Sequence, residues 1–293
     1  MDTSIQKHYS KIRRVLVIVL ILNWAVAAAK IIYGFITHCQ SMAADGFHSF
    51  SDGASNIIGL VGIHLAGQPT DKDHPYGHRK YETLFSLGIA VMLFVVAFNL
   101  AKEGLKRIYN PAMPLIDIGS FAVMIVTLAI NLYVMQYERR KGIALKSDIL
   151  VSDAMHTRAD ILTSLSVIAA LVFIKMGFPI LDPIVTILIS IFIAYAGFEI
   201  VKKSSDVLVD SAAILDVNRI EDIVLSVKSV KTCHKIRTRG RPDDIHVDLH
   251  VQVSPDMHVD NAHKISYAIE EAIKKGIPEV TDVVVHIEPK RND

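Results

Sequence analysis

The sequence predicts an α-helical membrane protein with six transmembrane helices, followed by a small two-layer α+β domain. Three observations support this fold class. The 293 residues are 51% hydrophobic with a mean hydropathy of +0.37, which is too apolar for an ordinary soluble domain. Six apolar stretches reach the roughly 20 residues that a helix needs to cross a bilayer. The long apolar runs then stop, so we expect a membrane domain at 1–206 and a second domain at 207–293.

The six expected spans are separated by short polar connections. The first is interrupted by Lys30 and is longer than the core of a signal peptide, so we expect it to be retained as a helix. The expected spans cover residues 15–36, 42–66, 84–105, 116–135, 149–174 and 184–201.

Lysine and arginine residues gather in the connections on one side of the expected bilayer. They precede the first span, follow the last, lie between spans two and three, and lie between spans four and five, where we expect a basic loop from Glu138 to Lys141. A cluster at 102–107, on the opposite side, is an exception. The positive-inside rule therefore predicts a multi-pass protein of the cell inner (plasma) membrane with both termini cytoplasmic. Spans two and five would run antiparallel, as in an inverted repeat with a substrate site near the midplane.

Two of the expected spans carry the same polar motif, Asp-x-x-His-x-x-x-Asp. Spacings of three and four place its members on one helix face. Charged groups inside a membrane are costly and functional by default, although a structural polar contact between helices is the alternative. The two copies are Asp45, His48 and Asp52, extended by Asn56, and Asp153, His156 and Asp160.

Two imidazoles and two carboxylates can form the four-coordinate shell that Zn²⁺ accepts. The sequence offers them as His48, Asp52, His156 and Asp160. We expect Asp45, Asp153 and Asn56 to orient these ligands or to line the path to them. Because ligands must be deprotonated to bind metal, such a site favours exchange of a metal ion for protons.

A polar loop between spans two and three holds Asp71, His74 and His78, which are metal-ligand types at close spacing; a solvated loop is the alternative.

The second domain is expected to contain helix 217–227, strand 230–238, a turn at 239–243, strand 245–253, helix 261–275 and strand 283–288. The middle strand alternates strictly, so His246, Asp248 and His250 share one of its faces. His234, His263, His286 and Glu288 lie on neighbouring elements, which predicts a metal cluster; surface histidines are the alternative. The periodicity leaves the grouping of these ligands open.

Together these motifs resemble the cation diffusion facilitator family of divalent-metal/proton antiporters, over nearly the whole chain. The resemblance implies a homodimer and a ferredoxin-like (αββαβ) cytoplasmic domain. It implies that the paired His-x-x-x-Asp faces form the transport site, that the loop forms a second site, and that His234, His250, His263 and His286 form a regulatory site with Glu288 or Asp248. It also implies a charge interlock between protomers at Lys80 and Asp210.

Within that family, histidine on both helices resembles the zinc-preferring members. Zn²⁺ is therefore the expected substrate and regulatory ion, with Fe²⁺ as the main alternative and Mn²⁺ or Cd²⁺ as others. No catalytic cofactor is expected. The net charge of +1 gives no support to nucleic-acid binding. An intramembrane metalloenzyme and a membrane-anchored metal sensor are the competing classes of function, but the sequence has no His-Glu-x-x-His motif and six spans exceed what an anchor needs.

Overall fold

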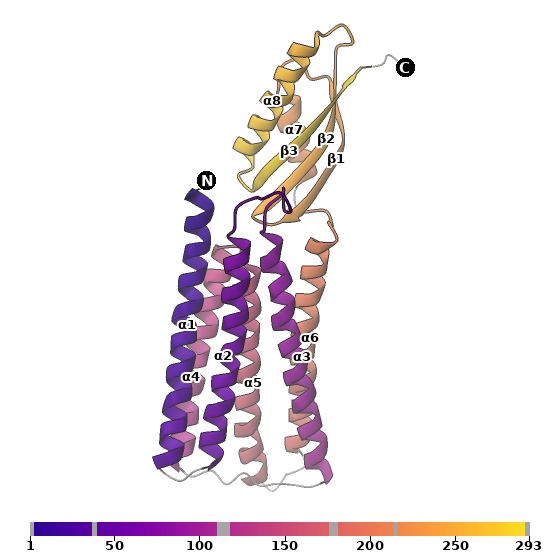
Figure 1. Cartoon of the computed structure of the whole chain (residues 1–293). Helices are drawn as coiled ribbons and strands as arrows, with labels where there is room; N and C mark the ends of the chain where they lie inside the picture. Colours follow the sequence, from indigo (N-terminus) through magenta and orange to yellow (C-terminus); the bar gives the residue numbers. More distant parts are fainter. Residues whose placement is uncertain (1–2, 37–39, 110–117, 176–180, 214–215, 291–293) are drawn as a thin grey trace. The chain divides into compact units, whose positions relative to one another are not determined.

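The computed structural model describes residues 3–36, 40–109, 118–175, 181–213 and 216–290 (Figure 1). The chain forms two compact units, Met1–Ser204 and Ser205–Asp293. Each unit has its own hydrophobic core.

The first unit is a bundle of long helices that alternate in direction, so α2 and α5 run antiparallel (Figure 1). Within the described residues, four segments are long and apolar enough to cross a membrane: Gln6–Tyr33, Lys80–Lys106, Phe121–Ala144 and Pro183–Leu208. The predicted fold class, a helical membrane protein with a C-terminal domain of helices and strands, is confirmed. The helices are α1 (Thr3–Ile36), α2 (Gln40–Ala66), α3 (Lys80–Tyr109), α4 (Ile118–Ala144), α5 (Asp148–Lys175) and α6 (Leu181–Leu208).

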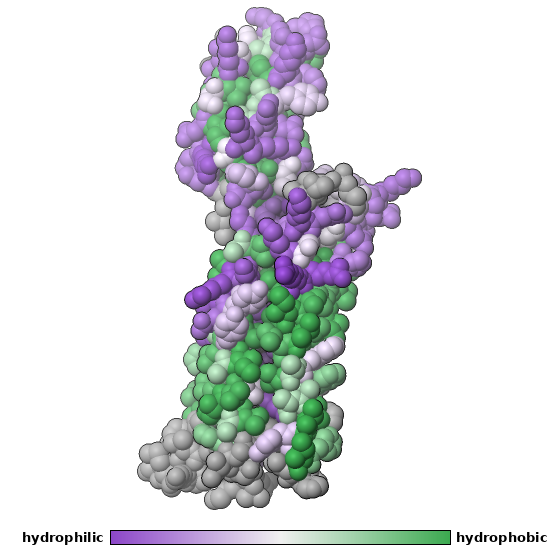
Figure 2. All heavy atoms as spheres, turned by 90° about the vertical axis from the view of Figure 1, so that its left-hand side faces the viewer, coloured by the Kyte–Doolittle hydropathy of each residue, from purple (hydrophilic) through white to green (hydrophobic). Residues whose placement is uncertain are grey.

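Hydrophobic side chains cover the outside of this bundle on the face shown in Figure 2. Large apolar side chains of the bundle that are exposed include Ile21, Val91, Phe98 and Phe192. Such a surface suits lipid tails, which interact with apolar side chains as well as a protein core does.

Buried polar contacts tie α3 to the start of α5. Glu82 is fully buried and accepts hydrogen bonds from Ser147 Oγ at 2.5 Å and from the backbone N–H of Ile149 at 3.4 Å. One residue on, Thr83 donates to Asp148 at 2.9 Å. These bonds satisfy polar groups that would otherwise be costly to bury.

The helix α4 is longer than predicted. The expected basic loop from Glu138 to Lys141 is helical and belongs to α4, which ends at Ala144. Glu138 is buried there because Thr157 of α5 donates a hydrogen bond to it at 3.1 Å. A contact from another helix therefore overrides the loop-like local composition.

The second unit has two layers, with helices α7 (Val217–Leu225) and α8 (Val259–Gly276) on one face of a three-stranded sheet (Figure 1). Strand β2 (Asp244–Val253) lies in the middle, antiparallel to β1 (Thr232–Arg241) and parallel to β3 (Val280–Pro289). Alternate residues of β2, such as Leu249 and Val251, are buried against Ile269 and Ile273 of α8. The predicted turn at 239–243 is shorter than expected, since β1 continues to Arg241.

Gly62 provides a test of the helical packing, because it lies where α2 approaches both α3 and α5. An added Cβ would lie 2.6 Å from Cβ of Phe85 and 2.7 Å from Cδ1 of Ile149. We expect Gly62→Ala to lower the melting temperature of the detergent-solubilised protein, since overpacking costs roughly 1–3 kcal/mol. Gly88→Ala is the matched control, because its added Cβ would meet nothing closer than 3.3 Å. Equal melting temperatures for the two variants would contradict this packing.

Candidate metal centres

The membrane site is built on α5, where His156 and Asp160 follow Asp153 along one helix face. The side chains of Asp45, His48 and Asp52, which belong to the same predicted site, lie outside the described residues. The helix that carries them, α2, is described and packs beside α5 in the bundle.

A chain of buried hydrogen bonds fixes how α1, α2 and α5 meet. Asn23 of α1 donates to the side-chain oxygen of Asn56 on α2 at 3.1 Å, and Asn56 in turn donates to Asp153 on α5. Asn56 and Asp153 are both almost fully buried. The contact sets the register of α2 against α5, and it joins Asn56 and Asp153, two residues expected to orient the ligands or to line the path to them.

His156 is buried, with 2% of its side chain exposed, and neither ring nitrogen has a hydrogen-bond partner among the described residues. Buried polar groups in proteins are almost always hydrogen-bonded, so an imidazole with two unused nitrogens calls for a ligand or a proton donor. The two unpartnered nitrogens therefore make His156 a candidate metal ligand, independently of the sequence motif.

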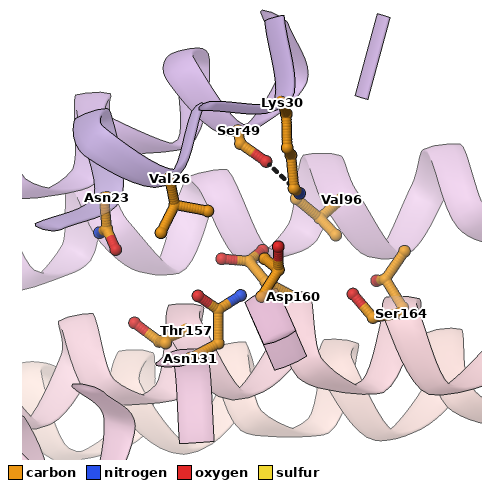
Figure 3. Close-up of a pocket in the computed structure, with 11 residues that line it drawn as sticks. Asn23, Val26, Lys30, Ser49, Val96, Asn131, Thr157, Asp160 and Ser164 are labelled. Atoms are coloured by element: carbon orange, nitrogen blue, oxygen red, sulfur yellow. Dashed lines mark hydrogen bonds between the residues drawn. The ribbon is translucent and has the colours of Figure 1, made fainter. Parts of the chain in front are cut away.

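Asp160 lines a small polar cavity of about 70 Å³ between the helices (Figure 3). Asn131 of α4 and Ser164 of α5 border the same cavity. Lys30 of α1 reaches into it and donates a hydrogen bond to Ser49 of α2 at 2.9 Å. The cavity is thus polar and charged in the middle of an apolar bundle.

Sequence reasoning missed two functional candidates near this site. In the sequence Lys30 is only an interruption of an apolar run, yet a charge inside a predicted span is itself the signal for function. The sequence predicts a loop at Glu138, but this residue is buried in α4 and its Oε1 atom has no partner among the described residues. No local sequence pattern distinguishes Glu138 from the basic residues next to it.

The loop cluster consists of Asp71, His74 and His78, which the structure brings together. Their ligand atoms all lie within 4.8 Å of one another. The backbone N–H of His74 donates to Asp71 at 2.6 Å and holds the pKa of that carboxyl below its ordinary value. His78 is buried and lies 3.4 Å from the other Asp71 oxygen, and its Nδ1 has no partner among the described residues. An ionised carboxylate and two imidazoles are suitable donors for a divalent metal.

The sheet cluster consists of His234 on β1, His250 on β2, and His286 and Glu288 on β3. The ligand atoms of His234, His250 and Glu288 lie within 4.8 Å of one another. His250 is paired with His234 on one side and with His286 on the other. Glu288 lies 2.7 Å from His250, 3.3 Å from His234 and 3.6 Å from His286. The hydrogen bond with His250 lowers the pKa of Glu288, with the other two imidazoles adding to the effect.

Other predicted members of that site lie elsewhere in this chain. His263 is exposed on α8, which covers the opposite face of the sheet. Asp248 shares the face of His250 but forms an ion pair with Arg237 at 3.2 Å.

The predicted charge interlock consists of Lys80 and Asp210. Asp210 lies 3.7 Å from Arg239 in the same unit. Lys80 is the first residue of α3.

Comparison with known proteins covers both units of the chain. A model of the cation efflux transmembrane domain matches residues 16–209, and a model of the cation efflux protein cytoplasmic domain matches residues 215–290. An uncharacterised transporter of Methanocaldococcus jannaschii is 30% identical over 279 residues, which cover 95% of this chain and 98% of that protein.

Two further relatives have more specific names. The manganese efflux system protein MneS of Bacillus subtilis is 26% identical and the match covers 85% of this chain and 86% of MneS. The cation-efflux pump FieF of Shewanella oneidensis is also 26% identical, with 89% and 88% covered. Because the transmembrane model alone matches well over half of the residues, the chain belongs to the cation efflux family, the cation diffusion facilitators.

Proposed function

We propose that this multi-pass membrane protein exports a divalent metal ion, in the first place Zn²⁺, in exchange for protons. The proposed site is made of His48, Asp52, His156 and Asp160. One observation carries the proposal: His156 is buried in the bundle with both ring nitrogens unpartnered among the described residues. Leaving such a group unsatisfied costs roughly 1–3 kcal/mol, which a bound metal or proton would offset.

The register of the helices supports the same ligand set. Asn56 of α2 is bonded to Asp153 of α5, and the two helices run antiparallel. One helical turn before Asn56 comes Asp52, and one turn after Asp153 comes His156. The next turn brings His48 on α2 and Asp160 on α5. Periodicity thus favours two successive levels, each with one imidazole and one carboxylate.

The donor set favours Zn²⁺, because two nitrogens and two carboxylate oxygens suit its tetrahedral shell and two aspartates balance its charge. Fe²⁺ accepts the same donors. The name of the relative MneS makes Mn²⁺ a further candidate, and Cd²⁺ remains an alternative. Since the family is one of transporters, we favour transport over the enzyme and sensor classes.

We further propose that the protein acts as a homodimer in the cell inner (plasma) membrane, with both termini and the second unit in the cytoplasm. The match to the cation efflux cytoplasmic domain supports this orientation. In this arrangement the sheet cluster would bind cytosolic Zn²⁺ (or Fe²⁺) as a regulatory ion. His263 would join that site only if a second chain supplied it. The loop cluster would be an additional cytoplasmic metal site, and Lys80 with Asp210 would link protomers.

The first prediction concerns the membrane site. Asp160→Ala should abolish Zn²⁺ flux into proteoliposomes, because it removes a charged ligand while its neighbours stay buried. Thr163→Val is the matched control on the same helix and cavity, since its hydroxyl already bonds the backbone oxygen of Ala159 at 2.9 Å. The control should transport at close to the wild-type rate. Near-normal flux in Asp160→Ala would remove Asp160 from the site.

The second prediction concerns proton exchange. Zn²⁺ affinity at the membrane site should fall as the pH is lowered, because protons compete with the metal for the ligand atoms. Calorimetric titrations of the wild type and Asp160→Ala, in two buffers of different ionisation enthalpy, isolate the membrane site by difference. The loop and sheet clusters are intact in both proteins and cancel. A difference in heat that is the same in both buffers would rule out net proton exchange.

The third prediction concerns the sheet cluster. Zn²⁺ should raise the melting temperature of the isolated segment from residue 207, since a ligand at a hundredfold excess over Kd stabilises the folded form by about 2.7 kcal/mol. His250→Ala with His286→Ala should remove this shift and weaken the dependence of flux on cytosolic metal in the full chain. His263→Ala is the matched control, because α8 lies on the other sheet face. An equally large loss in His263→Ala would mean that a second chain supplies His263.

A further inference from the structure

We propose that Lys30 is the resident counter-cation of the metal site: its ammonium group, bonded to Ser49, balances the charge of Asp160 across the shared cavity in the empty carrier and withdraws to Ser49 alone when metal binds. The inference rests on the proposed metal site at Asp160, and it adds a residue from α1 to a site otherwise built on α2 and α5.

The position of Lys30 is the first support. The residue lies in the last turn of the segment Gln6–Tyr33, which is apolar enough to cross a membrane, yet it is buried in the bundle with only 6% exposed. A buried ammonium group in such a segment is costly and nearly always has a counter-charge or a functional role. Its ammonium group donates a hydrogen bond to the Ser49 hydroxyl at 2.9 Å, which joins α1 to α2 beside the cavity.

The shared cavity is the second support. Lys30 and Asp160 are the only charged residues among the described residues that line it, and they have opposite signs. Asparagine, serine and threonine side chains provide most of the remaining lining, and Figure 3 shows Lys30 reaching from α1 toward the side that Asp160 borders. An ammonium group has three donors on a flexible four-carbon stem, so it can exchange one acceptor for another without a helix moving.

The charge balance gives this arrangement a function. An empty carrier holds carboxylates in the middle of the bilayer, and one of them gains a counter-charge if Lys30 approaches it. An incoming divalent ion competes with that ammonium for Asp160 and repels it. Lys30 should therefore lower metal affinity and speed the release of metal and the return of the empty carrier.

A purely structural role makes the opposite prediction for Lys30. If Lys30 only joined α1 to α2 through Ser49, then removing either partner would loosen the site and weaken metal binding. If Lys30 competes with metal, then loss of its charge should tighten binding. Loss of Ser49, which accepts the displaced ammonium, should weaken it.

The test measures Zn²⁺ affinity and transport rate in the full-length protein, with His74→Ala and His250→Ala present throughout to weaken the loop and sheet clusters. We expect Lys30→Gln to lower the Kd about tenfold or more, as loss of one nearby like charge implies, and to lower the maximal rate. Lys30→Arg keeps the charge and should stay close to the wild-type Kd. Ser49→Ala should raise the Kd.

Thr127→Val is the matched control for general disturbance of the cavity, because the Thr127 hydroxyl bonds its own helix at Val123 O, 2.9 Å away. Its Kd should match the wild type. If Asp160→Ala abolishes binding but Lys30→Gln leaves the Kd unchanged or raises it, the inference is overturned. Binding that survives Asp160→Ala would instead overturn the proposed metal site. If Lys30→Gln fails to fold, Lys30→Met carries the same test, because it also removes the charge, and an unchanged or higher Kd in that variant overturns the inference.

Discussion

Polar side chains between the helices must find partners inside the protein, because the bilayer core offers no water to them. The chain of hydrogen bonds from Asn23 through Asn56 to Asp153 meets this requirement and at the same time joins α1, α2 and α5. The positions of all the proposed intramembrane ligands depend on that register. A shift of one residue in either helix would rotate its ligands by about 100° away from the shared face.

The two units gather metal-binding side chains in different ways. In the helical unit, ligands from one helix stand three or four residues apart, and the second helix has to be locked alongside. In the second unit, hydrogen-bonded strands place His234, His250 and His286 next to each other, and the opposite face of β2 is committed to the core. Glu288 then touches all three imidazoles. The strand alternation thus separates the core of this unit from its binding face.

The sequence was sufficient for features that depend on local patterns. Apolar length predicts the spans, and alternation predicts that His246, Asp248 and His250 share a face, as the burial of β2 confirms. The grouping of the remaining ligands depends on contacts distant in sequence. The parallel register of β3 brings Glu288 to His250, whereas α8 carries His263 to the other side.

Glu138 shows the same limit in the membrane domain. Its neighbours in sequence are basic, and only the contact with Thr157 of α5 reveals that it is buried.

The buried carboxyl of Glu82 limits how the bundle can rearrange during a transport cycle. It accepts bonds from Ser147 and from the N–H of Ile149, and the next residue, Thr83, bonds Asp148, so the beginning of α3 is fastened at several points to the beginning of α5. Alternating access in transporters proceeds largely by rigid-body rocking of helix groups. The ends of α3 and α5 that carry these contacts must therefore move together, unless several buried hydrogen bonds break in each cycle. The hinge for any movement of α3 relative to α5 therefore lies further along these helices, beyond the hydrogen bonds of Glu82 and Thr83.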